Sequence, residues 1–264
     1  MKRVYNLREE KVQNVPYAFF NVNASLLPSS VDLRSKCPPV YDQGNLGSCT
    51  SNAVLGYIEF LDRTFRGSRL FHYWNERAVD GNINTDSGSS ISRSIEVLKN
   101  IGVCSESIWP YDTSKFTVKP PDECFQKASL HKIVDAQLVS MNDMKSCLSE
   151  GYPIYLGIKI YESFENGIGS YNGKMSIPSN GEKYLGNHAI LIVGYNDNDK
   201  TWMCRNSWGS SWGDKGYFYL PYDYLNGNVI SDLWKITRVT TTPNDPSDDI
   251  PPDSKCSSCK CSIL

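Results

Sequence analysis

The spacing of apolar residues changes once along this chain of 264 residues, and that change limits the folds open to it. Between Ala53 and Leu61, apolar residues recur every three or four positions, which predicts a helix over residues 49–64. A second stretch with helical spacing covers residues 91–102 and ends on a glycine that can cap a helix. The first half of the chain is therefore predicted to be helical.

In the second half, the apolar stretches are short, rich in β-branched and aromatic residues, and separated by Gly, Asn or Pro. This pattern is typical of antiparallel strands. The predicted strands cover residues 133–139, 153–160, 186–195, 201–205, 216–220 and 232–239. Helices followed by strands favour an α+β fold with two lobes that divide near residue 130.

The composition along the chain suggests three parts. Residues 1–26 have no strong period, and we interpret them as an N-terminal segment. Residues 27–240 form the predicted domain, with a helical lobe over about 27–130 and a β lobe over about 131–240. The remaining residues, 241–264, are rich in Pro, Asp and Cys with almost no apolar content, which predicts a flexible tail.

Charge and targeting signals narrow the function classes. With 27 basic and 29 acidic residues, the formal net charge of −2 argues against binding to nucleic acid or to an anionic membrane surface. No run approaches the roughly 18 apolar residues of a transmembrane helix, and charged residues occupy the positions where a signal peptide needs an apolar core. Nine cysteines, an odd number at irregular spacing, favour a reducing, cytoplasmic or intracellular compartment.

Cys49 lies at the predicted start of the first helix, directly after a glycine-rich loop. Unpaired N–H groups and the positive end of the helix dipole favour a thiolate at such a position. A single cysteine among small residues is nevertheless more often a packed core residue. Cys49 therefore counts as a nucleophile only if the chain also supplies a base, a group that orients the base, and donors for an oxyanion.

Three further residues supply these groups. His188 opens a strand-like apolar run after two turn residues and is a usable base, although many such histidines are structural. Asn206, among aromatic residues, can hold an imidazole nitrogen, although an isolated asparagine is more often a turn residue. Gln43, six residues before Cys49, can offer an amide N–H that forms a two-donor oxyanion hole with the Cys49 backbone.

Three sequence blocks, QGNLGSC, NHAILIVGY and RNSWGSSWGDKGYF, resemble the papain/cathepsin family of cysteine peptidases, and a weaker likeness covers about residues 27–240. The resemblance is to a compact, bacterial- or viral-type branch. It implies a two-lobed fold, with a helical lobe and a barrel-like antiparallel β lobe on either side of a cleft. It further implies Cys49 as nucleophile, His188 as base, Asn206 as its orienting amide and Gln43 as oxyanion donor, with no metal or organic cofactor.

The resemblance also suggests where a peptide substrate binds. It implies substrate-binding roles for Gly88, Ser89, Asn187 and Trp208, with Trp208 also shielding the Asn206–His188 contact. Asn187, Ala189, Gly157 and Ile91 are candidates for the specificity pocket.

The sequence departs from the family pattern at two positions. Leu46 stands where secreted members have one half of a disulfide, which agrees with a reducing compartment. Thr50 replaces a large aromatic residue beside the nucleophile.

The two ends of the chain leave alternatives open. Residues 1–26 are either a short inhibitory propeptide, with residues 15–20 in or near the cleft, or a segment packed on the lobes as a strap. The last four residues, Cys261–Leu264, fit a prenylation pattern, so membrane attachment is expected only if this tail is lipidated. The tail cysteines could instead bind a soft metal or be inert.

The leading functional interpretation is a monomeric thiol endopeptidase, made as a zymogen, that acts on proteins or peptides. An exopeptidase with one end of the cleft blocked is the nearest alternative. A non-catalytic peptide-binding relative is a second alternative, and an acyl transferase is a third.

Overall fold

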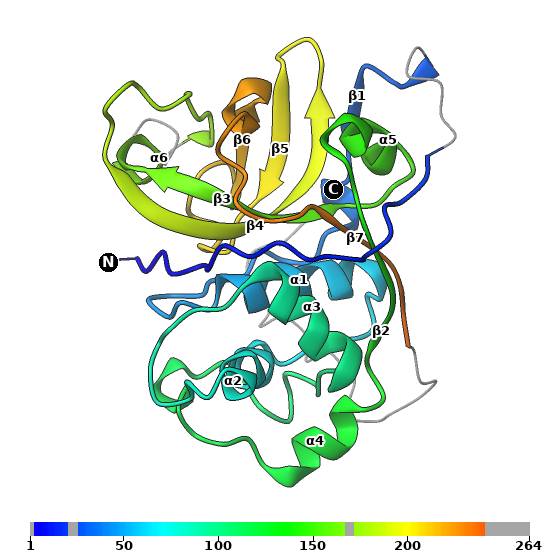
Figure 1. Cartoon of the computed structure of the whole chain (residues 1–264), viewed down its shortest axis with the longest axis vertical. Helices are drawn as coiled ribbons and strands as arrows, with labels where there is room; N and C mark the ends of the chain where they lie inside the picture. The colour runs from blue at the N-terminus through cyan, green and yellow to red at the C-terminus, as the bar shows by residue number, and fades with distance from the viewer. Residues whose placement is uncertain (1–2, 21–25, 167–171, 241–264) are drawn as a thin grey trace, which may run out of the picture.

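The computed structural model describes residues 3–20, 26–166 and 172–240. Six α-helices occur in this part of the chain. They are α1 (Cys49–Leu61), α2 (Arg69–Val79), α3 (Ile91–Asn100), α4 (Asp122–Ala128), α5 (Met144–Ser149) and α6 (Glu162–Asn166). Figure 1 shows α1 to α4 together in the lower half of the molecule, below β3, β4, β5 and β6.

Seven strands within the described residues form one sheet. They are β1 (Ser30–Asp32), β2 (Ile133–Leu138), β3 (Ile154–Tyr161), β4 (Tyr184–Asn196), β5 (Thr201–Arg205), β6 (Tyr217–Pro221) and β7 (Trp234–Val239). The strand order is β2-β7-β3-β4-β5-β6, with β1 paired to β4, and every strand pair is antiparallel. The α+β fold and all six predicted strands are confirmed, with ends that differ by one or two residues.

Helix α1 is the central element of the fold. All its residues from Cys49 to Phe60 are buried, and it contacts α2, α3, β4 and β7. Two hydrogen bonds fasten it to the sheet: the Tyr155 hydroxyl donates to the Thr50 carbonyl at 3.1 Å, and the Ile236 N–H donates to the Tyr57 hydroxyl at 3.1 Å. The start of α1, where Cys49 lies, is thereby held against the sheet.

The structure corrects two helix predictions. The predicted helix 49–64 ends at Leu61, because the Asp62 carboxylate accepts the N–H and hydroxyl of Thr64 and turns the chain. Helix α2 was not predicted. Polar side chains of α2, among them His72, Glu76 and Arg77, are buried together with the apolar ones, so hydrophobicity alone does not mark the buried face of this helix. The second predicted helix is confirmed, and Gly102, at φ +90°, ends it by donating its N–H to the Val97 carbonyl.

The N-terminal residues cross the molecule between the helices and the sheet (Figure 1). We call residues 3–20 the strap. The division into segment 1–26, domain 27–240 and tail 241–264 stays a prediction, and the tail with its lipidation motif lies outside the described residues. Within the described residues, no helix is long and apolar enough to span a membrane.

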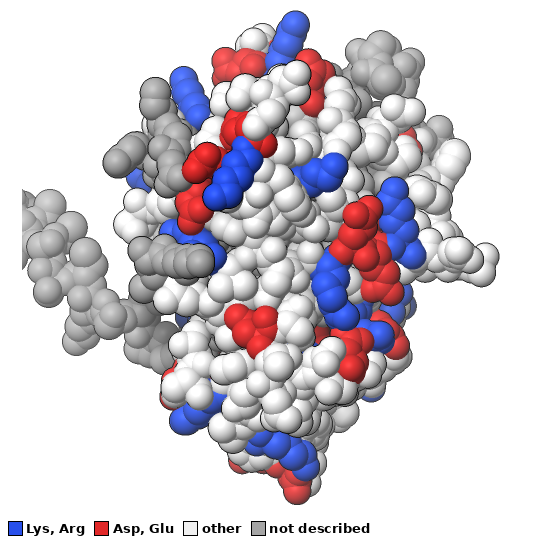
Figure 2. All heavy atoms as spheres, turned by 60° about the vertical axis from the view of Figure 1, so that its left-hand side comes forward, with Lys and Arg blue, Asp and Glu red and all other residues white. Residues whose placement is uncertain are grey.

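The surface carries charges of both signs. On the face shown in Figure 2, Lys and Arg lie beside Asp and Glu, and neither sign gathers into a continuous patch.

Candidate active site

Cys49 is the first residue of α1, and no side chain caps this helix. The first N–H groups of α1 are therefore available to the thiol. Burial raises the pKa of Cys49 to about 12, opposed by backbone N–H groups of Ala189, Thr50 and Cys49 itself, which face the sulfur. Because Ala189 directly follows His188 in β4, the fold brings the thiol beside the strand that carries the predicted base.

His188 is fully buried in β4, opposite Ile158 of β3. Its Nε2 lies 2.8 Å from Oδ1 of Asn206, the residue directly after β5, and its Nδ1 has no hydrogen-bond partner among the described residues. Burial lowers the pKa of His188 to about 4, and Arg3 lowers it further while the Asn206 hydrogen bond raises it. The ring of Trp208 packs beside the imidazole, with the two ring centroids 5.1 Å apart.

Gln43 is held at both ends of its side-chain amide. Its Oε1 accepts a hydrogen bond from the Ser207 hydroxyl at 2.6 Å, and its Nε2 donates to the Leu46 carbonyl at 3.0 Å. Its backbone N–H also donates to the Ser207 carbonyl at 2.9 Å. An amide nitrogen has two hydrogens, so one Nε2–H remains for an oxyanion. Ser207, which the sequence analysis did not single out, thus joins Gln43 to the Asn206 loop.

The strap backbone is bound from both sides near these residues. The Tyr5 carbonyl accepts the N–H of Asn187 at 3.4 Å, and the Leu7 carbonyl accepts the Asn187 side-chain amide at 3.1 Å. On the helical side, the Arg8 N–H donates to the Ser89 carbonyl at 2.8 Å. Two predicted substrate-binding residues therefore hold a segment of the chain itself.

The strap side chains fill the space around the predicted catalytic residues. The Arg3 guanidinium lies 4.0 Å from the Trp208 ring centroid, and Tyr5 packs edge-on against His188. Leu7 is 3% exposed and packs against Gly157, where an added Cβ would lie 2.5 Å from Leu7 Cδ2.

Leu7 thus occupies a pocket that includes one of the predicted specificity residues. The same added Cβ at Gly157 would lie 2.9 Å from Ile230, so Ile230 belongs to this pocket. The sequence analysis missed it, since Ile230 follows an irregular stretch between strands.

The location of the strap corrects one expectation. Residues 3–8, and not 15–20, lie at the predicted catalytic residues. The later part of the strap pairs with β2, where the Ala18 N–H donates to the Leu138 carbonyl at 2.7 Å. There Tyr17 and Phe19 are 61% and 88% exposed.

Gly88 also lies against the strap, since a Cβ added there would lie 2.0 Å from the Asn6 carbonyl oxygen. The Gly88 N–H donates to the Tyr73 hydroxyl at 3.1 Å, and the carbonyl of the neighbouring Ser89 accepts the Arg8 N–H of the strap. Ile91 is buried at the start of α3. The six cysteines of the described residues are all free.

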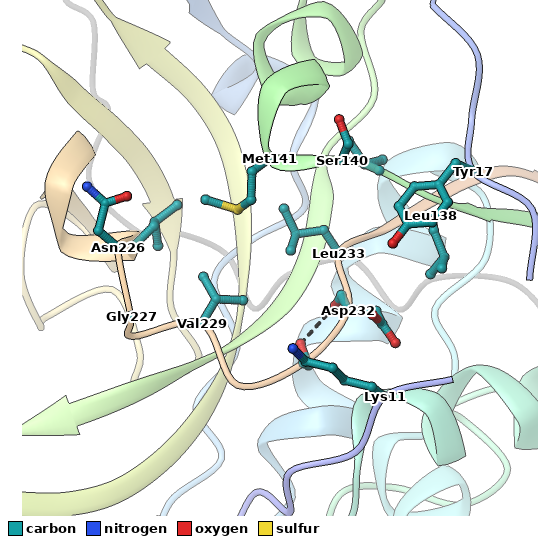
Figure 3. Close-up of a pocket in the computed structure, with 13 residues that line it drawn as sticks. Lys11, Tyr17, Leu138, Ser140, Met141, Asn226, Gly227, Val229, Asp232 and Leu233 are labelled. Carbon is teal, nitrogen blue, oxygen red and sulfur yellow. Dashed lines mark hydrogen bonds between the residues drawn. The ribbon is translucent and has the colours of Figure 1, made fainter. Parts of the chain in front are cut away.

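A cavity of about 620 Å³ lies beside the strap (Figure 3). Lys11 and Tyr17 of the strap line one part, and Met141, Val229 and Leu233 line another. Its lining includes none of the predicted catalytic residues. Since the strap fills the space at those residues, the hollow next to it is not the expected substrate site.

A family model for papain family cysteine proteases matches residues 27–232. The chain belongs to this family. It is 37% identical to an uncharacterized peptidase C1-like protein of Acanthamoeba polyphaga mimivirus, over 89% of this chain and 83% of that protein. It is also 30% identical to cysteine proteinase 3 of Entamoeba histolytica, over 80% of this chain and 69% of that protein.

Among solved structures, the chain is similar to xylellain, a cysteine protease from Xylella fastidiosa. The TM-score is 0.79 at 34% identity, covering 88% of this chain and 95% of xylellain. The predicted papain-like α+β fold and the bacterial- or viral-type likeness are confirmed. The chain is a papain-like cysteine protease, a hydrolase whose substrates are peptides or proteins.

Proposed function

We propose that Cys49 and His188 are the nucleophile and general base of this protease. The observation that carries the proposal is the packing of α1 on β4, because α1 begins at Cys49 and β4 contains His188. The backbone N–H of Ala189, the residue after His188, also lowers the pKa of the Cys49 thiol. Because Asn206 holds Nε2, the free nitrogen for proton transfer is Nδ1. Asn206 is the residue that orients the imidazole.

The proposed reaction proceeds through an acyl-enzyme. Cys49 transfers its proton to His188 Nδ1, and the sulfur attacks the carbonyl carbon of the scissile peptide. The oxyanion accepts hydrogen bonds from the Cys49 N–H and the remaining Nε2–H of Gln43. His188 then protonates the leaving amine, and water deprotonated by His188 hydrolyses the thioester. These residues supply the acid, base and nucleophile, so the reaction as proposed uses no metal or organic cofactor.

The way the strap is bound supports a site for extended peptides. The proposed substrate-binding residues all contact the strap, and they are Gly88, Ser89, Asn187 and Trp208. The strap extends to both sides of His188, from Arg3 at Trp208 to Arg8 at Ser89. A site with room on both sides of the scissile bond favours cleavage of internal bonds, and hydrolysis of peptides blocked at both ends tests this against an exopeptidase.

We further propose that the strap inhibits the protease. The carbonyls of Tyr5 and Leu7 are bound to Asn187, and no hydrogen bond among the described residues joins a strap carbonyl to Gln43 Nε2 or the Cys49 N–H. The strap therefore blocks the site, but none of its carbonyls lies in the proposed oxyanion hole, where the carbonyl of a cleaved bond would lie. While it covers the site, burial favours the neutral thiol and the neutral imidazole. We expect Cys49 and His188 to form a thiolate–imidazolium pair once water replaces the strap.

The proposal is tested by labelling the protein with a peptidyl epoxide and mapping the modified residue. We expect the label on Cys49 and no peptide hydrolysis by the Cys49→Ala variant. Undiminished hydrolysis by that variant would overturn the assignment.

A further inference from the structure

The Leu46–Gly47 peptide group, two residues before the nucleophile, is held from both of its polar ends. Its carbonyl accepts the hydrogen bond from Gln43 Nε2 at 3.0 Å. Its N–H points to the carboxylate of Asp86, with the nitrogen 3.0 Å from each oxygen. Because a peptide group is planar and rigid, a rotation that moves the N–H also moves the carbonyl. The contact to Asp86 therefore restricts the group on which the Gln43 amide rests.

Asp86 lies in the segment between α2 and α3, and α2 supplies its second partner. The hydroxyl of Tyr73, a fully buried residue of α2, donates to Asp86 Oδ1 and accepts the N–H of Gly88. Burial, together with the negative charge of Asp86, raises the pKa of Tyr73 far above its usual value. The hydroxyl therefore keeps its proton and remains a donor to the carboxylate.

These contacts connect two segments that the proposed mechanism uses. Gly47 belongs to the loop before the nucleophile, and Gly88 adjoins Ser89, whose carbonyl binds the strap. Within the described residues, the Gly47–Asp86 contact is the direct hydrogen-bonded link between residues 44–48 and residues 86–90. Hydrogen bonds to an ionised acceptor are about twice as strong as neutral ones, so a carboxylate suits this position.

We propose that Asp86 is a positioning residue that sets the oxyanion donor Gln43 through the Leu46–Gly47 peptide. The inference rests on the proposed function of Cys49 and Gln43. It assigns to Asp86 a part in acyl transfer and none in the nucleophilicity of the thiol. Tyr73 keeps the carboxylate in place, and the N–H of Gly88 in turn fixes the Tyr73 hydroxyl.

The test separates acyl transfer from thiol reactivity in the full chain. Asp86→Asn keeps the shape of the side chain and removes its charge. We expect kcat for a peptide substrate to fall about tenfold, which is less than the effect of deleting an oxyanion donor. KM should change less than about threefold. Alkylation of Cys49 by iodoacetamide needs no oxyanion hole, and its rate should change less than about twofold. Asp62→Asn, which removes a partly exposed carboxylate at the other end of α1, is the matched control and should leave both rates unchanged.

A double-mutant cycle tests the route through Gln43. If Asp86 acts on Gln43, Asp86→Asn should lower kcat no further in a Gln43→Ala background. The inference would be overturned if Asp86→Asn left kcat unchanged or slowed the alkylation of Cys49 as much as it lowered kcat. It would also be overturned if Asp86→Asn lowered kcat by its full factor again in the Gln43→Ala variant. If the Asp86→Asn protein is too unstable to assay, Tyr73→Phe serves in its place, because it removes the donor to the carboxylate. Tyr73→Phe should lower kcat by the same factor and leave the alkylation rate of Cys49 unchanged. Failure of Tyr73→Phe to do so would also overturn the inference. Turnover by Cys49→Ala would instead overturn the proposed function.

Discussion

Oδ1 of Asn206 lies 2.8 Å from Nε2 of His188, and Trp208 packs beside the imidazole. This hydrogen bond fixes the plane of the imidazole and leaves Nδ1 as the nitrogen that can exchange a proton. The same oxygen also accepts the N–H of Ser207 at 2.8 Å, so the backbone holds the asparagine in place.

The first prediction concerns this contact. Asn206→Ala removes the group that orients the base, but the base itself remains. General acid–base catalysis contributes about 10²- to 10⁴-fold to the rate of a reaction. Because a misoriented base loses only part of this contribution, we expect kcat to fall roughly 10- to 100-fold. Cys49→Ala should abolish turnover. Steady-state hydrolysis of one blocked peptide by both variants checks the order, and an Asn206→Ala variant as inactive as Cys49→Ala would contradict it.

The second prediction concerns inhibition by the strap. A chain that starts at Leu27 lacks every strap contact to Trp208, Asn187 and Ser89. We expect it to hydrolyse peptides faster than the full chain and to react faster with iodoacetamide at Cys49. Equal rates for the two chains, both folded by circular dichroism, would mean that the strap is structural only.

The third prediction identifies Leu7 as an anchor of the strap. Replacing a buried leucine by alanine typically destabilises a folded structure by about 2–5 kcal/mol. For Leu7, this loss would weaken the binding of the strap to the site. Leu7→Ala should therefore raise the activity of the full chain. Phe19→Ala is the matched control, because Phe19 belongs to the same strap but is largely exposed. Comparable activation by both variants would argue against a specific pocket for Leu7.

The fourth prediction is that acid weakens strap binding. Burial lowers the pKa of His188 to about 4 from an ordinary value of 6.5. Between these values an exposed imidazole binds a proton that the covered one does not, so lowering the pH through this window favours the open form. Glu10 acts in the same direction: burial alone would raise its pKa, but hydrogen bonds from Ser90 and Ser92 outweigh burial and lower it. Docking of the strap should be complete above about pH 6.5 and weaken toward pH 4.

Hydrogen exchange of single amides measures this effect. After correction for the intrinsic pH dependence of exchange, the Arg8 N–H, which binds the Ser89 carbonyl, should be less protected at pH 4.5 than at pH 7. The Ala18 N–H, which pairs with Leu138 away from His188, should change less. Equal protection of Arg8 at both values would contradict the prediction.

Much of the fold was predictable because each half of the chain has its own apolar period. The strands from β2 to β7 are bounded by turn residues and were found to within one or two positions. Helix α2 was missed because polar residues such as His72, Glu76 and Arg77 belong to its buried face, so its buried positions cannot be recognised from hydrophobicity. The proposed catalytic residues could be named because their sequence blocks are distinctive.

The supporting contacts could not be predicted, because they join residues far apart in the chain. Nothing in the sequence links Asp86 to Gly47, or Ser207 to Gln43. The strap shows the same limit: its residues at the site are Arg3 to Arg8, yet the more apolar stretch 15–20 was the more obvious candidate. Only the fold decides which part of an irregular segment meets a distant strand.

The strap and the groove it fills are parts of one polypeptide, and this sets how the site responds to free molecules. A tethered segment acts at an effective concentration in the millimolar range, independent of how dilute the protein is. An added peptide must compete against that concentration. Its apparent affinity for the full chain would therefore understate its affinity for the vacated groove, and diluting the protein would not release the strap.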